Sequence, residues 1–185
     1  MKIIICLFGV IPRSIKWTYA SINTKIIKPL KNLYNVVDIY GCNMKTNMVD
    51  GVIINHDDMR VVPFTYYEEI EQDTVDEMVF PDINSGKIQF MHTYPKQTTH
   101  NALRQMYTEY KVGCFLENHQ TEYDLAIVLS ADQWIANNIC IEHIQTAAQT
   151  NVIYLSDVNP GYGFTNGFYF RKPAILIPLL HLCTF

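Results

Sequence analysis

The stretch YDLAIVLSADQW, from Tyr123 to Trp134, carries the strongest fold signal in this chain. Residues 125 to 129 are continuously apolar and partly β-branched, which is typical of a strand buried on both faces of a parallel sheet. The run stops at Ser130, Ala131 and Asp132, so Asp132 is predicted at the carboxyl end of a central strand. Ligands of open α/β sheets bind outside these carboxyl ends. A carboxylate delivered there by a rigid strand is well placed to hold a metal ion or a polar substrate.

Length and composition are those of one globular domain. The chain has 185 residues, 49% hydrophobic and 17% charged, enough to bury a sizeable core but small for two domains. Its formal net charge of -4 argues against a large basic surface for DNA or RNA. A local basic pocket for a nucleotide phosphate is compatible with that charge. We therefore expect a single domain, residues 1–185, that does not bind nucleic acid.

The cysteines indicate a reducing compartment, because the five of them are widely spaced and form no CxxC pair. The amino-terminal apolar run is short, β-branched and closed by Pro12 and Arg13, which favours a first strand over a signal peptide. Apolar runs of roughly 20 residues, the length that spans a bilayer, are absent from the sequence. These features predict a cytoplasmic protein without a transmembrane segment.

Strand and helix patterns alternate along the chain. Strands are expected at residues 2–8, 36–40, 60–64, 125–129, 152–155 and 168–170. Helices are expected at residues 14–33, with a disturbance at Pro29, at 66–78, from Thr98 or Thr99 onward, at 137–149 and from Pro173 onward. Residues 41–51 are polar and rich in turn formers. This alternation predicts an α/β fold, with a mixed, mostly parallel, Rossmann-like sheet and helices on both faces.

The turn after the first strand lacks two common phosphate-binding motifs. Its sequence, FGVIPRS, contains neither the GxGxxG of dinucleotide-binding folds nor the GxxxxGK of P-loops. A nucleotide in this sheet would therefore need another α/β binding design.

The residues resemble one such design, the GT-A glycosyltransferases, in which a DxD motif holds a divalent metal on the donor diphosphate. The likeness rests on an apolar strand that ends in an acidic tripeptide, in a chain that begins with strand, short loop and helix. SAD occupies the DxD place, so the resemblance carries metal ligation to Asp132, and Ser130 departs from the pattern. The segment DVNPGYGFTNGFYFRKP, from Asp157 to Pro173, is similar to the acceptor-side loop and following strand of small glycosyltransferases, in particular those of chlorella-type algal viruses.

The resemblance implies a Mn²⁺ or Mg²⁺ site. Cleavage of a nucleoside-diphosphate sugar leaves negative charge on the departing phosphate, which a hard cation on a carboxylate stabilises. Asp132 is the expected ligand, and one acid can suffice because the substrate phosphates supply further oxygens. Its alternative role is a cap on the following turn. GT-A enzymes often use a histidine downstream of the acidic motif, which points to His181, although a histidine in PLLHL also suits a packed helical position.

A second acid is expected on the acceptor side. Asp157 follows the apolar run NVIYLS and precedes the turn NPGYG, so it is predicted at the same edge of the sheet. In an inverting enzyme Asp157 would take the acceptor proton as general base, and in a retaining enzyme it would bind substrate or stabilise charge. The alternative is an Asx turn in which the carboxylate bonds to nearby backbone.

The loop after the first strand is the expected nucleotide pocket. Phe8, Gly9 and Val10 can bring backbone groups to a base, and Arg13 can approach phosphate. A solvated Arg13 is the alternative.

Two further pairs are candidates for the donor. Asp38 and Tyr40, expected at the end of the second strand, can meet ribose and base. Arg104 and Gln105, on the helix before the central strand, can reach the diphosphate or the sugar. The alternatives are ordinary strand-end residues and a surface arginine.

The expected activity is transfer of a hexose or deoxyhexose from a nucleotide-sugar donor, a UDP-sugar, to a glycan or glycoprotein acceptor. The viral resemblance implies that the acceptor is a capsid-protein glycan made in the host cytoplasm. One alternative is a non-catalytic nucleotide- or glycan-binding module of the same fold. Another is an unrelated α/β hydrolase or phosphotransferase.

Overall fold

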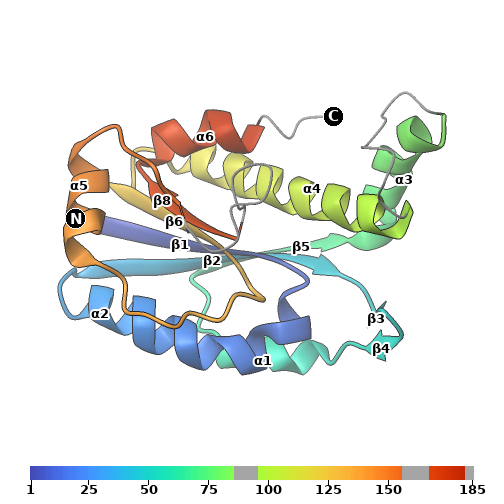
Figure 1. Cartoon of the computed structure of the whole chain (residues 1–185), viewed down its shortest axis with the longest axis horizontal. Coiled ribbons are helices and arrows are strands. Elements are labelled where there is room, and N and C mark those ends of the chain that lie inside the picture. Colours follow the sequence, from blue (N-terminus) through green and yellow to red (C-terminus); the bar gives the residue numbers. More distant parts are fainter. Residues whose placement is uncertain (86–95, 156–166, 182–185) are drawn as a thin grey trace.

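A six-stranded sheet forms the centre of the protein (Figure 1), whose computed structural model describes residues 1–85, 96–155 and 167–181. The strand order is β5-β2-β1-β6-β8-β7. The strands are β1 (Lys2–Gly9), β2 (Val36–Lys45), β5 (Tyr66–Glu71), β6 (Leu125–Ser130), β7 (Tyr154–Leu155) and β8 (Phe168–Arg171). β5, β2, β1 and β6 are parallel, whereas β8 is antiparallel to both of its neighbours. The predicted mixed, mostly parallel α/β sheet is confirmed.

Helices cover both faces of the sheet (Figure 1). One face carries α1 (Ile11–Ile22), the π-helical η1 (Asn23–Ile27), α2 (Lys28–Lys31), the 3-10 helix η2 (His56–Val61) and α5 (Ile141–Gln149). The other carries α4 (Lys96–Asn118) and α6 (Pro173–His181), and α3 (Gln72–Asn84) packs on α4. Among the described residues, none of these helices is long and apolar enough to cross a membrane.

The central strands are apolar on both sides because each side faces a different helical layer. Ile3, Ile5 and Leu7 of β1 pack with α1 and α5, whereas Ile4 and Cys6 pack with α4 and α6. Residues 125 to 129 of β6 are also fully buried. Each buried aliphatic side chain contributes about 1.5–3 kcal/mol, so this double burial fixes the position and register of β1 and β6.

Helix α1 begins three residues earlier than expected. Its first amide, that of Ile11, donates to Oδ1 of Asn43 at 3.0 Å, and Pro12 occupies the first turn. Asn43 is fully buried in β2. The expected disturbance at Pro29 takes the form of η1, a π-helical stretch that ends just before α2. Since proline has no amide hydrogen, a local change of the helical bonding pattern lets the chain continue as helix.

Three local predictions are wrong. Residues 41 to 45 continue β2, residues 56 to 61 form a 3-10 helix in place of the expected strand at 60–64, and Tyr66–Glu71 is a strand rather than the start of a helix. In β5, residues at alternate positions are half-buried and exposed, as in an edge strand. Pairing with β2 therefore overrides the acidic composition that suggested a helix.

A short hairpin follows β2, formed by β3 (Met48–Val49) and β4 (Val52–Ile53). Its two turn residues, Asp50 and Gly51, have φ angles of 49° and 79°. Two consecutive residues with positive φ define the type I′ turn, for which Asp-Gly is a preferred pair.

Candidate active site

A cavity of about 300 Å³ lies at the carboxyl ends of β1 and β6. Its walls come from the β1–α1 turn, the β3–β4 hairpin, helices α3 and α4, and the residues that end β6. Seven of its lining residues are among those proposed from the sequence: Phe8, Gly9, Val10, Arg13, Arg104, Gln105 and Asp132. The fold therefore brings the carboxylate after the central strand into one space with the loop and helix residues proposed for the donor.

The segment that carries Asp132 is tied to the core on two sides. The amide of Ala131 donates to the carbonyl of Phe8 at 3.1 Å, and the hydroxyl of Thr18 on α1 donates to the carbonyl of Ala131 at 2.7 Å. One helical turn later, Ser21 accepts a hydrogen bond from the amide of Ile135 at 3.1 Å. These bonds fix the backbone on both sides of Asp132, although its side chain is exposed.

Ser130 contacts Asp132 directly. Its hydroxyl donates a hydrogen bond of 2.6 Å to Oδ1 of Asp132. In the part of the chain that the structure describes, the Asp132 carboxylate accepts this hydrogen bond through Oδ1. Its other oxygen, Oδ2, is available for a ligand. The serine at the place of the first acid thus orients the acid that remains.

Gly9 ends β1 at the cavity wall with a φ of 105°. L-residues with a side chain rarely adopt this angle. A Cβ atom built at Gly9 would meet nothing within 4 Å. The conformation of the turn, rather than the available space, therefore requires glycine here, and the turn exposes its backbone to the cavity.

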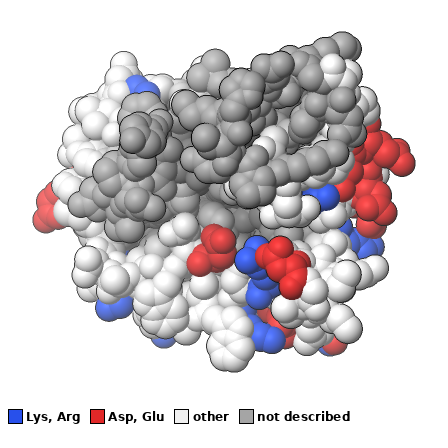
Figure 2. Space-filling model, turned by 45° about the vertical axis from the view of Figure 1, so that its right-hand side comes forward, with Lys and Arg blue, Asp and Glu red and all other residues white. Residues whose placement is uncertain are grey.

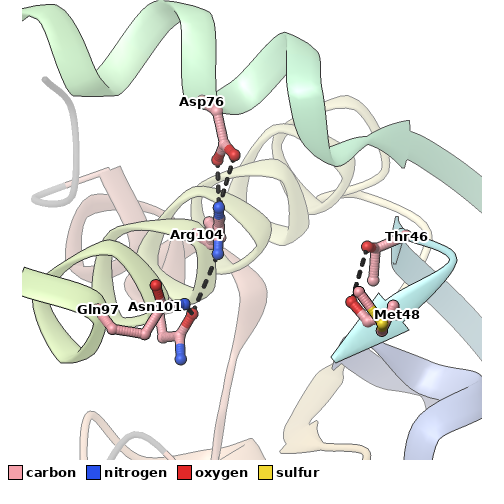
Figure 3. Close-up of polar contacts among 6 residues, drawn as sticks. All are labelled: Thr46, Met48, Asp76, Gln97, Asn101 and Arg104. Carbon is pink, nitrogen blue, oxygen red and sulfur yellow. Dashed lines mark hydrogen bonds and ion pairs between the residues drawn. The ribbon is translucent and has the colours of Figure 1, made fainter. Parts of the chain in front are cut away.

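Arg104 is held on the α4 wall by an ion pair with α3 (Figure 3). Its Nε and Nη2 atoms donate to the two carboxylate oxygens of Asp76 at 2.7 Å and 2.5 Å. Nη1 donates to Oδ1 of Asn101 at 3.1 Å, which also accepts from Gln97 at 3.1 Å. A guanidinium has five N–H donors, so two remain for a ligand. The sequence reasoning did not identify Asp76 or Asn101 as site residues. The helical spacing of residues 97, 101, 104 and 108 could have placed Asn101 on the same face of α4 as Arg104.

The opposite wall is the β3–β4 hairpin (Figure 3). The hydroxyl of Thr46 donates to the carbonyl of Met48 at 3.2 Å, which stiffens the approach to the hairpin. At the hairpin tip Asp50 lies 3.9 Å from a guanidinium nitrogen of Arg13, and both side chains are more than half exposed. Figure 2 shows basic and acidic side chains adjoining one another near the middle of this face of the molecule, and acidic side chains gathered at its right-hand edge.

Asp38 and Tyr40 do not lie at this edge, and their expected position at the end of the second strand is wrong. Because β2 runs on to Lys45, they pair with Ile4 and Cys6 in its first half. Asp38 accepts hydrogen bonds from Thr65 at 3.1 Å and from Tyr123 at 2.9 Å.

Tyr40 is a core residue. Its ring stacks on Phe115 with 3.9 Å between centroids, and its hydroxyl donates to Glu68 at 2.9 Å. Burial raises the pKa of Tyr40. The β2 residue that lines the cavity is Met44, which the sequence reasoning placed in a turn.

His181 is the last residue of α6 and packs against α4, outside the residues that line the cavity. Its ring is 5.4 Å from that of Tyr110, and its Nε2 is 4.0 Å from a carboxylate oxygen of Glu117. A Cβ atom at Gly113 would approach the His181 ring to 2.8 Å. This is the packed helical position that was the alternative to metal ligation. Asp157, the expected acceptor-side carboxylate, lies outside the described residues.

The ligand groups near Asp132 are those of a hard cation, a carboxylate and a hydroxyl. Within residues 1–85, 96–155 and 167–181, no group of three His, Cys, Asp or Glu side chains could hold a metal ion by itself. A Mn²⁺ or Mg²⁺ ion beside Asp132 would take its remaining oxygen ligands from water or from a substrate.

Comparison with known proteins supports the fold. No protein-family model matches the sequence, and no curated protein matches it. Among solved structures, the apo crystal structure of mouse xyloside xylosyltransferase 1 matches with a TM-score of 0.50 and 11% sequence identity, over 98% of this chain and 71% of that chain. The fold is glycosyltransferase-like. This likeness concerns the arrangement of sheet and helices, which is the expected GT-A-like architecture.

Proposed function

We propose that the protein is a glycosyltransferase that moves a sugar from a UDP-sugar to a glycan or glycoprotein acceptor, with Mn²⁺ or Mg²⁺ beside Asp132. The observation that carries the proposal is the cavity that joins Asp132 to the β1–α1 turn and to Arg104. The fold of a xylosyltransferase supports it. A viral capsid glycan as acceptor, and a cytoplasmic location, stay predictions from the sequence.

Asp132 and Ser130 are the residues proposed to face the metal. The cation would supply positive charge to the diphosphate as the bond to the sugar breaks. Ser130 keeps the Asp132 carboxylate in one orientation through their 2.6 Å hydrogen bond. Since the chain offers one carboxylate where DxD enzymes have two, the diphosphate oxygens would complete the coordination.

The other lining residues are proposed to bind the donor. The exposed backbone of Gly9 and Val10 suits hydrogen bonds to a base. Arg13, at the mouth, and Arg104, on α4, carry N–H donors suited to phosphate oxygens. Arg104 is the better oriented of the two because Asp76 and Asn101 already hold its guanidinium. Asp157 remains the candidate for the acceptor hydroxyl.

Thermal melting with UDP tests the donor site. UDP with Mn²⁺ should raise the melting temperature more than UDP alone, because a ligand that binds only the native state stabilises it. Asp132→Asn should abolish the metal-dependent part. Glu77→Gln, which removes an exposed charge on α3, should leave it intact and serves as the matched control. Absence of any shift with UDP would rule out the proposal.

The departure at Ser130 favours one second candidate, a binding module of the same fold that has lost turnover. Both candidates predict stabilisation by UDP. Only the transferase predicts metal-dependent release of UDP from at least one member of a UDP-sugar panel, with loss of that release in Asp132→Asn. UDP binding without release from any donor, with or without added glycan acceptors, would favour the module.

A further inference from the structure

A second cavity, of about 340 Å³, lies beside the first. The two share Arg13, Val49 and Asp50 as lining residues, so the cavities adjoin across the Arg13–Asp50 pair. The second is bounded by α1 on one side and by the β3–β4 hairpin and the start of η2 on the other. Its volume is within the range of about 300–1,000 Å³ that is typical of small-ligand sites.

Trp17 provides a flat apolar wall of this second cavity. The residue lies on α1 and is 68% exposed, a large fraction for the largest apolar side chain. The face of an indole ring carries partial negative charge. It therefore attracts the weakly positive C–H groups on the apolar face of a pyranose ring, while the hydroxyl groups around that ring stay free for hydrogen bonds.

Hydrogen-bonding groups lie next to this wall. The Asp58 carboxylate accepts two hydrogen bonds. Oδ2 accepts from the ammonium of Lys16 at 2.8 Å, and Oδ1 accepts from the side-chain amide of Asn55 at 2.9 Å. The Lys16 nitrogen is 5.3 Å from the centroid of the Trp17 ring. Ammonium and amide groups have further donors, and the amide and carboxylate have further acceptor positions. A ring stacked on Trp17 would thus find both donors and acceptors at its edge.

The charges of this cavity balance. Arg13 and Lys16 are positive, Asp50 and Asp58 are negative, and each cation lies near one of the anions. Because the two cations are offset by the two carboxylates, the charges of this cavity give neither a phosphate nor a cation a net attraction. An aromatic platform with neutral overall charge and mixed donors and acceptors matches an uncharged polyhydroxyl ligand instead.

We propose that the second cavity binds a sugar unit of an uncharged glycan, stacked on Trp17 and bonded to the cluster of Lys16, Asn55 and Asp58. The inference rests on the proposed function, since a glycan held here would be the acceptor, with its reactive end extending past Arg13 and Asp50 into the first cavity. The cavity would then select acceptors by a sugar unit distant from the one that reacts.

The two tryptophans of the chain allow a direct test. In Trp134→Phe, Trp17 is the remaining tryptophan, and its fluorescence reports on the second cavity alone. The full chain, free of nucleotide and metal, is titrated with xylotriose, cellotriose, mannotriose and lactose. At least one of these sugars should change the emission in a saturable manner. If none does, the inference is overturned.

Calorimetry on the same sugars separates stacking from structural effects. Trp17→Ala should weaken binding by tenfold or more, Trp17→Tyr by only a few-fold, and Asp58→Asn by an intermediate factor. Trp134→Phe, a change at the other exposed tryptophan, should bind as the unchanged protein does. Equal affinities of Trp17→Ala and the unchanged protein would overturn the inference.

The outcome is independent of the UDP experiment. Stabilisation by UDP and Mn²⁺ without sugar binding would remove the glycan site and leave the donor site standing. Sugar binding that depends on Trp17, without any effect of UDP, would support the glycan site and rule out the transferase.

Discussion

The ion pair between Asp76 and Arg104 provides the sharpest test of how the cavity wall is built. Asp76→Ala removes both hydrogen bonds to the guanidinium, which donates to the carboxylate at 2.7 Å and 2.5 Å. The two side chains are only 18% and 19% exposed. After the change, Arg104 would keep its bond to Asn101 but lose the group that fixes its orientation.

The expected loss of stability lies between two known limits. Exposed ion pairs contribute about 0–1 kcal/mol, whereas hydrogen bonds to charged groups contribute about 1.5–3 kcal/mol. Because this pair is bidentate and largely shielded from water, we expect Asp76→Ala to cost about 2 kcal/mol. For a domain of this size that corresponds to a fall of about 4–8 °C in melting temperature. Asp76→Asn keeps the shape but should also destabilise the protein, because its amide nitrogen is a donor and cannot accept the second hydrogen bond from Arg104.

Thermal and urea unfolding measure this loss, with Asp57→Ala as the matched control. Asp57 also pairs with an arginine, Arg60, at 3.0 Å, but the two side chains are 68% and 81% exposed. This control should cost less than about 1 kcal/mol. If Asp76→Ala destabilises the protein no more than Asp57→Ala does, burial of the pair does not strengthen it, and the account of a pre-oriented Arg104 fails. UDP affinity should fall in Asp76→Ala and stay unchanged in the control.

Two further predictions concern the frame around the cavity. Gly41→Ala would place a Cβ atom 2.5 Å from a ring carbon of Phe64, so it should lower the free energy of unfolding in urea by about 1–3 kcal/mol. Phe64→Leu in the same chain should restore part of that loss. An unchanged free energy of unfolding in Gly41→Ala would contradict the packing. Burial raises the pKa of Glu69, but hydrogen bonds from Lys45 and Tyr67 outweigh it and hold the pKa below its ordinary value of 4.5. The stabilisation by Glu69 is therefore present above the pKa that Glu69 has in the unfolded chain, and it is lost as pH falls through the pKa that Glu69 has in the folded protein. Glu69→Gln should thus reduce the loss of unfolding free energy at acid pH. An unchanged pH dependence of the unfolding free energy would refute this.

The central strands and Asp132 could be predicted because their signal is local. A strand covered on both faces needs consecutive apolar residues, and such a run is visible wherever it occurs. Its abrupt end places the next polar side chain at the strand terminus, where Asp132 lies. The β1–α1 turn was predicted for the same reason, because it directly follows the other such strand.

β2 shows where local sequence patterns fail to predict the structure. Gly41 and Asn43 interrupt the apolar residues of β2, which suggests a turn, yet both lie in the strand. Asn43 is tolerated there because its side chain bonds the first amide of α1 and lies 3.4 Å from Glu69. The added length of β2 moves Asp38 and Tyr40 away from the site. Partners more than 25 residues away thus decide these positions.

Local sequence was enough to predict the α/β class, the two central strands and an acid at the edge where ligands bind, because each depends on burial within one segment. Which residues come together at the candidate site depended on tertiary contacts. Arg104 and Asp76 are 28 residues apart, and Thr18 and Ala131 are 113 apart. Whether such residues meet depends on how helices pack against the sheet, since the period of one helix or strand specifies which face is buried but not which distant side chain it will face.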